Sequence, residues 1–205
     1  MNPLLLYIYD IKIIIINIIY MQSLSSYIIE GVVEGYHFTH AQCLIKILQS
    51  DIYKCSEDDG YNPPGYDYYF STTRSQNANT GYSQGFINNK NVVKLVIDNN
   101  KISNHYKIIP IDMMRGKWRA VKNMYKDPKI FDKIYNELMK QVDVEAEDRV
   151  LSKSPDIKNF SKYIKKIIIN NNNIEPDLAD DIIRYADRRN IEVRIANEQE
   201  FINAR

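Results

Sequence analysis

Residues 36–48 read YHFTHAQCLIKIL and join two different hydrophobic patterns. The aromatic and β-branched side chains up to Thr39, with those just before them, predict a strand over residues 31–39. Apolar side chains then recur at helical spacing, which predicts a helix capped by Thr39 or His40. The chain has three histidines, and His37 and His40 both lie at this strand-to-helix junction. The junction is therefore a candidate site as well as the start of the fold.

The remaining strand and helix signals do not alternate regularly along the chain. Residues 51–67 read as a loop because they are rich in Gly, Pro, Asn and Asp. Further strands are predicted over residues 68–73, 92–98, 107–111, 163–170 and 191–196, and helices over residues 129–142 and 176–190. Several short strands with a few helices in a non-alternating order indicate an α+β fold.

Composition limits the classes of function. The 205 residues suit one compact domain. The 27 basic and 26 acidic residues nearly balance, so any surface for nucleic acid must be local. Two cysteines are too few for a disulfide framework, and no second pair completes a zinc site. We expect no metal and a cytoplasmic location.

The N-terminal run LLLYIYDIKIIIINIIY, residues 4–20, is almost wholly apolar. A membrane span needs about 20 apolar residues, and Asp10 and Lys12 lie near the middle of this run. It could be a membrane anchor, a segment packed on the domain, or an extension ahead of a start at Met21. We treat residues 1–22 as an extension and residues 23–205 as one domain, and we expect no membrane partner unless residues 4–20 anchor the chain.

Strand alternation places His37 and Thr39 on one face of the first strand and Tyr36 and Phe38 on the other. One face is then expected to pack, and the face with His37 to be wet or to line a cleft. An ordinary surface histidine is the alternative.

Two further groups of polar side chains stand out. Residues 70–75, FSTTRS, end a strand with hydroxyls and Arg74, whose planar guanidinium suits a phosphate. In residues 144–150, VEAEDRV, Glu145 and Glu147 share a face if the segment is extended, and close carboxylates take separate chemical roles. A solvated arginine at a strand tip and a solvated charge run are the alternatives.

In this order, the three groups resemble the ADP-ribosyltransferase superfamily, and most closely its DarT-type, DNA-modifying branch. That branch has a strand ending in Thr-His before a helix, an aromatic strand ending in an Arg-Ser or Arg-Asn step, and a glutamate in an Ala-Glu-x-x-Val context. The chain matches these motifs at Thr39-His40, Arg74-Ser75 and Ala146–Val150, and the resemblance covers roughly residues 30–170.

The chain also departs from this branch. Cys43 stands where the helix usually has Asn, and no Pro-Met step follows Arg74. Ser71-Thr72-Thr73 with Glu145-x-Glu147 also resembles the arginine-modifying protein transferases, whose first strand carries Arg where this chain has His37.

The resemblance implies a split central β-sheet with flanking helices, and NAD⁺ as a substrate without a metal. It implies that Glu147 holds the ribose 2′-hydroxyl, that Glu145 activates the acceptor, and that Arg74 binds pyrophosphate or orients the acceptor. It further implies that His37 and Thr39 hold the other ribose and that Ser71 braces Glu147. Tyr69 or Tyr82 is the candidate to stack on nicotinamide. His37, Arg74 and Glu147 should then converge on one cleft.

Residues 115–129 are expected to contact the acceptor. They hold six basic residues against one acid, Asp127, with aromatic side chains between them. The cations could bind phosphates and the rings could stack on bases, so a nucleic acid is narrowly favoured over a protein as the acceptor. The alternative is that these residues are the solvated start of a helix. The candidate nucleic-acid contacts are Arg115, Lys117, Trp118, Arg119 and Lys122.

Two other functions remain open. The chain could be a related enzyme, such as an RNA 2′-phosphotransferase or an NAD glycohydrolase. It could also be a non-enzymatic module that binds a nucleotide or a host factor. A small NAD-consuming enzyme with AT-rich codon usage would suit a toxin or an effector from a virus or mobile element.

Overall fold

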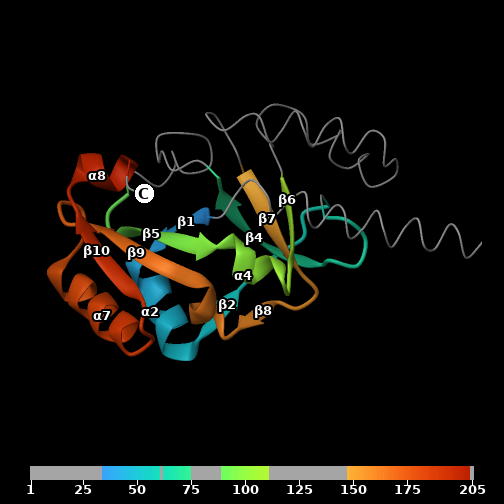
Figure 1. Cartoon of the computed structure of the whole chain (residues 1–205), viewed down its shortest axis with the longest axis horizontal. Helices are drawn as coiled ribbons and strands as arrows, with labels where there is room; N and C mark the ends of the chain where they lie inside the picture. The colour runs from blue at the N-terminus through green and yellow to red at the C-terminus, as the bar shows by residue number, and fades with distance from the viewer. Residues whose placement is uncertain (1–33, 61, 75–88, 111–146, 204–205) are drawn as a thin grey trace, which may run out of the picture.

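The computed structural model describes residues 34–60, 62–74, 89–110 and 147–203 (Figure 1). Within them, an eight-stranded sheet has the order β10-β9-β5-β1-β4-β7-β6, with β3 paired to the edge of β4. Its strands are β1 (Glu34–His40), β3 (Ser56–Glu57), β4 (Tyr68–Thr73), β5 (Val92–Asp98), β6 (Lys107–Pro110), β7 (Glu147–Ser152), β9 (Ile164–Asn170) and β10 (Glu192–Ala196). Only β9 and β10 pair in parallel among these strands. The predicted α+β class is confirmed.

Helices and a second, small sheet complete the described part of the chain. The helical elements are α2 (Ala41–Ser50), α4 (Asn99–Ser103), the 3₁₀ helix η3 (Phe160–Tyr163), α7 (Pro176–Asp187) and α8 (Glu198–Asn203). β2 (Ile52–Lys54) and β8 (Asp156–Lys158) form a two-stranded antiparallel sheet. None of the helices in the described residues has the length and apolar character that a membrane crossing requires.

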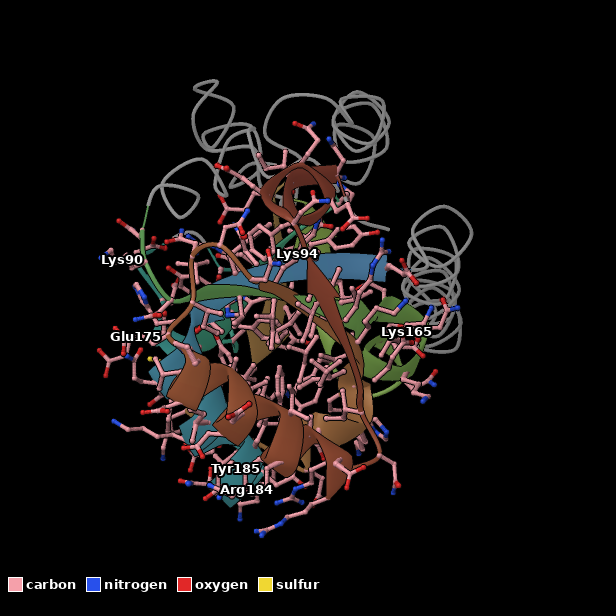
Figure 2. All side chains as sticks on the ribbon, turned by 90° about the vertical axis from the view of Figure 1, so that its left-hand side faces the viewer. Lys90, Lys94, Lys165, Glu175, Arg184 and Tyr185 are labelled. Atoms are coloured by element: carbon pink, nitrogen blue, oxygen red, sulfur yellow. The ribbon has the colours of Figure 1, made fainter. Side chains whose placement is uncertain are left out.

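Both faces of the large sheet are packed. On one face, α2 and α7 cover a core that includes Leu95 of β5 and Phe70 of β4. On the other face, a smaller cluster joins Tyr36 and Phe38 of β1 to Phe201 of α8. Figure 2 shows α7 on one side of the sheet and the labelled Lys94 on the side of α8. A sheet covered on both faces explains the nearly continuous apolar run of β5.

The sheet is split between β1 and β4. β1 pairs with β5 along its whole length, from Glu34↔Asp98 to His40↔Val92. It pairs with β4 at one position, Tyr36↔Thr73. β4 in turn pairs fully with β7. The two halves of the sheet therefore separate toward the C-terminal end of β1, where the predicted site begins.

Several local predictions need correction. Residues 51–67 were expected to be a loop, but they contain β2 and β3. His40 occupies the N-cap position of α2, but its side chain makes no capping hydrogen bond. The short helices α4 and α8 were not predicted. The predicted helix over residues 129–142 and the N-terminal run of residues 4–20 lie outside the described residues.

Candidate functional site

The strand register places His37 and Glu147 on opposite faces of the sheet. Directly opposed residues of antiparallel strands project their side chains to the same face. Tyr36 opposes Thr73, and Thr73 opposes Glu147, so these three share one face. His37 and Arg74 follow Tyr36 and Thr73 in sequence and belong to the other face. The prediction that His37, Arg74 and Glu147 converge on one cleft is therefore wrong.

Glu147 is held by a serine on the neighbouring strand. Ser71 Oγ donates a hydrogen bond of 2.8 Å to Glu147 Oε1, and Glu147 keeps partial exposure to solvent. This is the contact expected between these two residues. A carboxylate that accepts a hydroxyl hydrogen bond has a fixed orientation at the first residue of β7.

His37 is an interior residue. Its side chain is 5% exposed, and it contacts the rings of Tyr53 and Phe70 edge-to-face. Nδ1 lies 2.8 Å from the Ser71 carbonyl oxygen, and Nε2 lies 3.3 Å from Tyr53 Oη. Burial lowers the pKa of His37 to about 4, so the ring is neutral near pH 7. The expectation that the face with His37 is wet is wrong, because α2 and aromatic side chains cover it.

Arg74 is also buried. Its Nε lies 3.5 Å from Asp148 Oδ1, and both side chains are 5% exposed. Burial raises the pKa of Asp148 to about 6, while the charge of Arg74 opposes this rise and that of Glu147 adds to it. The contact places Arg74 in an interior ion pair on the face opposite Glu147. This differs from the predicted place of Arg74 in an open cleft.

Arg149 supplies a contact that sequence reasoning missed. Its guanidinium lies 3.7 Å from the ring centroid of Tyr69 and donates to both carboxylate oxygens of Asp59, at 2.7 and 2.9 Å. Because Arg149 opposes Ser71, these groups lie on the same face as Glu147. In the sequence, Arg149 directly follows Glu147 and Asp148, a pattern that is also typical of a solvated run of charges.

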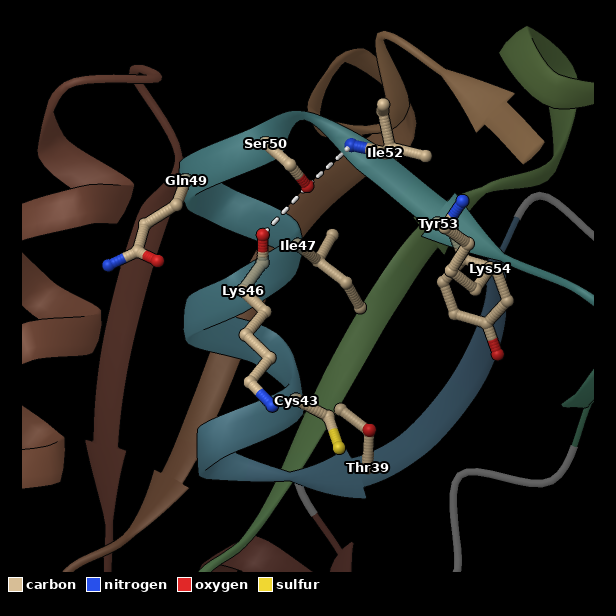
Figure 3. A pocket seen from close by; sticks show the side chains of 9 residues that line it. All are labelled: Thr39, Cys43, Lys46, Ile47, Gln49, Ser50, Ile52, Tyr53 and Lys54. Carbon is tan, nitrogen blue, oxygen red and sulfur yellow. Dashed lines mark hydrogen bonds between the residues drawn. The ribbon is translucent and has the colours of Figure 1, made fainter.

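A pocket of about 760 Å³ lies between α2 and β2. Figure 3 shows Thr39 and Cys43 at one end of it and Tyr53 across from α2. Its lining residues are Thr39, Cys43, Lys46, Ile47, Gln49, Ser50, Ile52, Tyr53 and Lys54. Thr39, predicted as a ligand contact, thus lines a cavity. His37 does not line it, although it contacts the hydroxyl of Tyr53, which does.

His40 lies on the opposite face of β1 from His37. It opposes Val92, a residue of the smaller cluster with Tyr36, and so it lies on the face that carries Glu147. It is exposed at the junction between β1 and α2. The Thr-His step that carries the motif resemblance therefore presents Thr39 to the pocket and His40 to the face of Glu147.

Seven predicted site residues lie outside the described residues. They are Tyr82, Arg115, Lys117, Trp118, Arg119, Lys122 and Glu145. Among the residues that are described, no group of three or more His, Cys, Asp or Glu side chains is arranged to hold a metal ion.

Comparison with known proteins gives structural likeness only. No protein-family model matches the chain, and no curated protein matches it. Three solved structures of Thermus sp. 2.9 DarT are similar to it, in complexes with carba-NAD⁺, NAD⁺ and ADP-ribosylated ssDNA. Their sequence identities to the chain are 11%, 10% and 9%, and their TM-scores are 0.47, 0.45 and 0.46. The matches cover 81% of this chain and 96%, 96% and 95% of those chains.

Proposed function

We propose that the protein is a mono-ADP-ribosyltransferase, an enzyme of the glycosyltransferase class that uses NAD⁺ as its substrate. The observation that carries this proposal is the hydrogen bond from Ser71 to Glu147 beside the split between β1 and β4. The family resemblance of the sequence predicts a contact between these two residues. The pocket between α2 and β2 supports the proposal by adding a cavity of nucleotide size.

Glu147 would act on the ribose next to nicotinamide. The bond between ribose C1′ and the nicotinamide nitrogen breaks, and its electron pair leaves with neutral nicotinamide. Positive charge then spreads over the ribose, where a fixed carboxylate stabilises it more than it stabilises the ground state. An acceptor nucleophile forms the new bond to C1′ and loses its proton to a base, a role that we propose for Glu145.

The pocket would take the nucleotide end of NAD⁺, and the rest of the molecule would then pass through the split between β1 and β4 to reach Glu147 on the other face. Ile47, Ile52 and the ring of Tyr53 offer apolar surface for a base, and Lys46 offers a cation for phosphate. Thr39 adds a hydroxyl at the end of the pocket that it shares with Cys43. We propose His40, in place of His37, as the imidazole that contacts the substrate on the side of Glu147.

A nucleic acid is the preferred acceptor in this proposal. The preference rests on the sequence of residues 115–129, in which six cations and two aromatic rings suit phosphates and bases. A protein acceptor is the second choice.

The test is NAD⁺ consumption by the wild type and by Glu147→Gln, with adenine-labelled NAD⁺ in a mixture of DNA, RNA and protein. Glu192→Gln is the matched control, because Glu192 is an exposed carboxylate paired with Lys166 at 3.1 Å. We expect consumption and labelling by the wild type and the control, and loss of both in Glu147→Gln. Consumption without any labelled macromolecule would favour an NAD glycohydrolase. A wild type that neither binds nor cleaves NAD⁺ would contradict the proposal.

A further inference from the structure

We propose that His37 is a positioning residue, which connects the wall of the pocket at Tyr53 to Glu147 through Ser71. The inference rests on the proposed function, because Glu147 is its endpoint. The contacts form one chain, from Tyr53 Oη to His37 Nε2, from His37 Nδ1 to the Ser71 carbonyl, and from Ser71 Oγ to Glu147. His37 thus acts on the substrate only through other residues.

His37 lies where β1 and β4 separate, and it joins the two strands there. Beyond the bridge Tyr36↔Thr73, β1 and β4 share no further ladder pair. A carbonyl on this edge of β4 would otherwise lose its strand partner, which is costly in the interior. The His37 ring bridges the gap and supplies the hydrogen-bond donor to the Ser71 carbonyl at 2.8 Å. His37 therefore holds β4 at the residue whose side chain orients Glu147.

The hydrogen bonds from Tyr53 to Glu147 all run in one direction. A carbonyl oxygen only accepts, so His37 Nδ1 carries the hydrogen that it donates to Ser71. The buried ring is neutral near pH 7, which leaves Nε2 as an acceptor for the Tyr53 hydroxyl. Ser71 Oγ then donates to the Glu147 carboxylate, which also only accepts. Every donor faces an acceptor, so the chain has one consistent orientation.

Aromatic side chains hold Tyr53 and His37 rigidly in place. Phe160 stacks at a tilt on Tyr53 with ring centroids 4.8 Å apart, and Phe70 lies 4.8 Å from Tyr53 and 5.8 Å from His37. These rings fix the plane of the imidazole. Tyr53 also lines the pocket, so a ligand that bonds to its hydroxyl acts on the same chain. A ligand in the pocket would therefore contact the residue at which the hydrogen bonds to Glu147 begin.

The kinetic test compares His37→Phe with His37→Asn in NAD⁺ consumption. Phe keeps a planar ring and removes both hydrogen bonds, whereas the Asn amide keeps a donor for the Ser71 carbonyl. We expect His37→Phe to lower kcat roughly 10- to 100-fold with little change in KM, because a small misplacement of a catalytic group is enough for such a loss. His37→Asn should recover most of this loss. Equal kcat for wild type and His37→Phe, or equal losses in both folded variants, would overturn the proposal.

A spectroscopic arm does not depend on turnover or on the stability of the His37 variants. Long-range ¹H–¹⁵N spectra of the wild type should show His37 with a protonated Nδ1 and an unprotonated Nε2. Tyr53→Phe and added ADP-ribose should each shift Nε2. A protonated Nε2, or an unchanged Nε2 in Tyr53→Phe, would refute the chain of contacts. If the wild type shows no NAD⁺ turnover, the proposed function fails while this arm still decides the contacts around His37.

Discussion

Ser71 reaches Glu147 diagonally across two strands. In the register of β4 and β7, Ser71 opposes Arg149, and Glu147 opposes Thr73. The 2.8 Å hydrogen bond from Ser71 Oγ to Glu147 Oε1 therefore joins residues that are one same-face position apart. A diagonal bond of this kind directs the carboxylate along the strand toward Ser71, and not straight across to Thr73.

Ser71→Ala should weaken catalysis while leaving the fold intact. The change removes the hydroxyl that orients Glu147 but keeps the backbone carbonyl that accepts from His37. A hydrogen bond to a charged group contributes about 1.5–3 kcal/mol, so kcat/KM for NAD⁺ should fall roughly 10- to 100-fold. Steady-state kinetics measure this loss.

Two further serine variants check that result. Ser71→Thr keeps a hydroxyl and should retain more activity than Ser71→Ala. In Ser103→Ala, the lost hydroxyl donates to the Asn100 carbonyl within α4, so activity should be unchanged. Equal activity in Ser71→Ala and the wild type would show that Ser71 does not orient Glu147.

Local sequence patterns predicted the strands of this site well. β4 and β5 have the predicted bounds, because β-branched and aromatic runs of this kind carry their own strand preference. Alternation also placed Tyr36 and Phe38 correctly on a packed face. These features depend on neighbouring residues alone.

The burial of His37 could not be predicted in the same way. It depends on the rings of Tyr53 and Phe70, which are distant from His37 in sequence, and Tyr53 lies in residues 51–67, which are predicted as a loop. The pair Arg74–Asp148 likewise depends on the pairing of β4 with β7. Polar residues on an alternating strand predict a wet face only when no helix covers that face, and here α2 covers it.

Asp148 should make stability depend on pH. Burial raises its pKa from 3.8 to about 6, so the folded state holds this proton to higher pH than the unfolded chain does. The stabilisation is fully present below about pH 4 and is lost as the pH rises through about 6. Relative to Asp148→Asn, which cannot ionise, the wild type should lose roughly 2 kcal/mol of unfolding free energy between about pH 4 and pH 7.

Urea unfolding of the wild type and Asp148→Asn across this pH range measures the difference. Asp180→Asn, at an exposed position of α7, is the control and should follow the wild type at each pH. A constant difference between wild type and Asp148→Asn would mean that the carboxyl ionises normally beside Arg74.

Arg149→Lys should destabilise the segment that contains Asp59. Lysine cannot donate to both oxygens of Asp59 or stack flat on Tyr69, as the guanidinium does. We expect a loss of about 1.5–3 kcal/mol in the free energy of unfolding. Chemical denaturation measures it. Arg184→Lys is the matched control, because Arg184 pairs with Asp181 on the exposed surface of α7 and should change stability by less than about 1 kcal/mol. Similar losses in both variants would contradict a special role for Arg149.

Gly35→Ala should destabilise the protein at the start of the split. A Cβ at this position would lie 2.8 Å from Asn99 Oδ1 and 3.3 Å from Thr72 Oγ1, so buried side chains must move. Overpacking of this kind costs about 1–3 kcal/mol of unfolding free energy. Asn99 Oδ1 has no hydrogen-bond partner within the described part of the chain, so Asn99→Ala removes the closest clash without breaking a bond to that oxygen. The double variant should therefore lose less stability than the sum of the single losses. Strict additivity in thermal or urea unfolding would show that Gly35 and Asn99 do not meet.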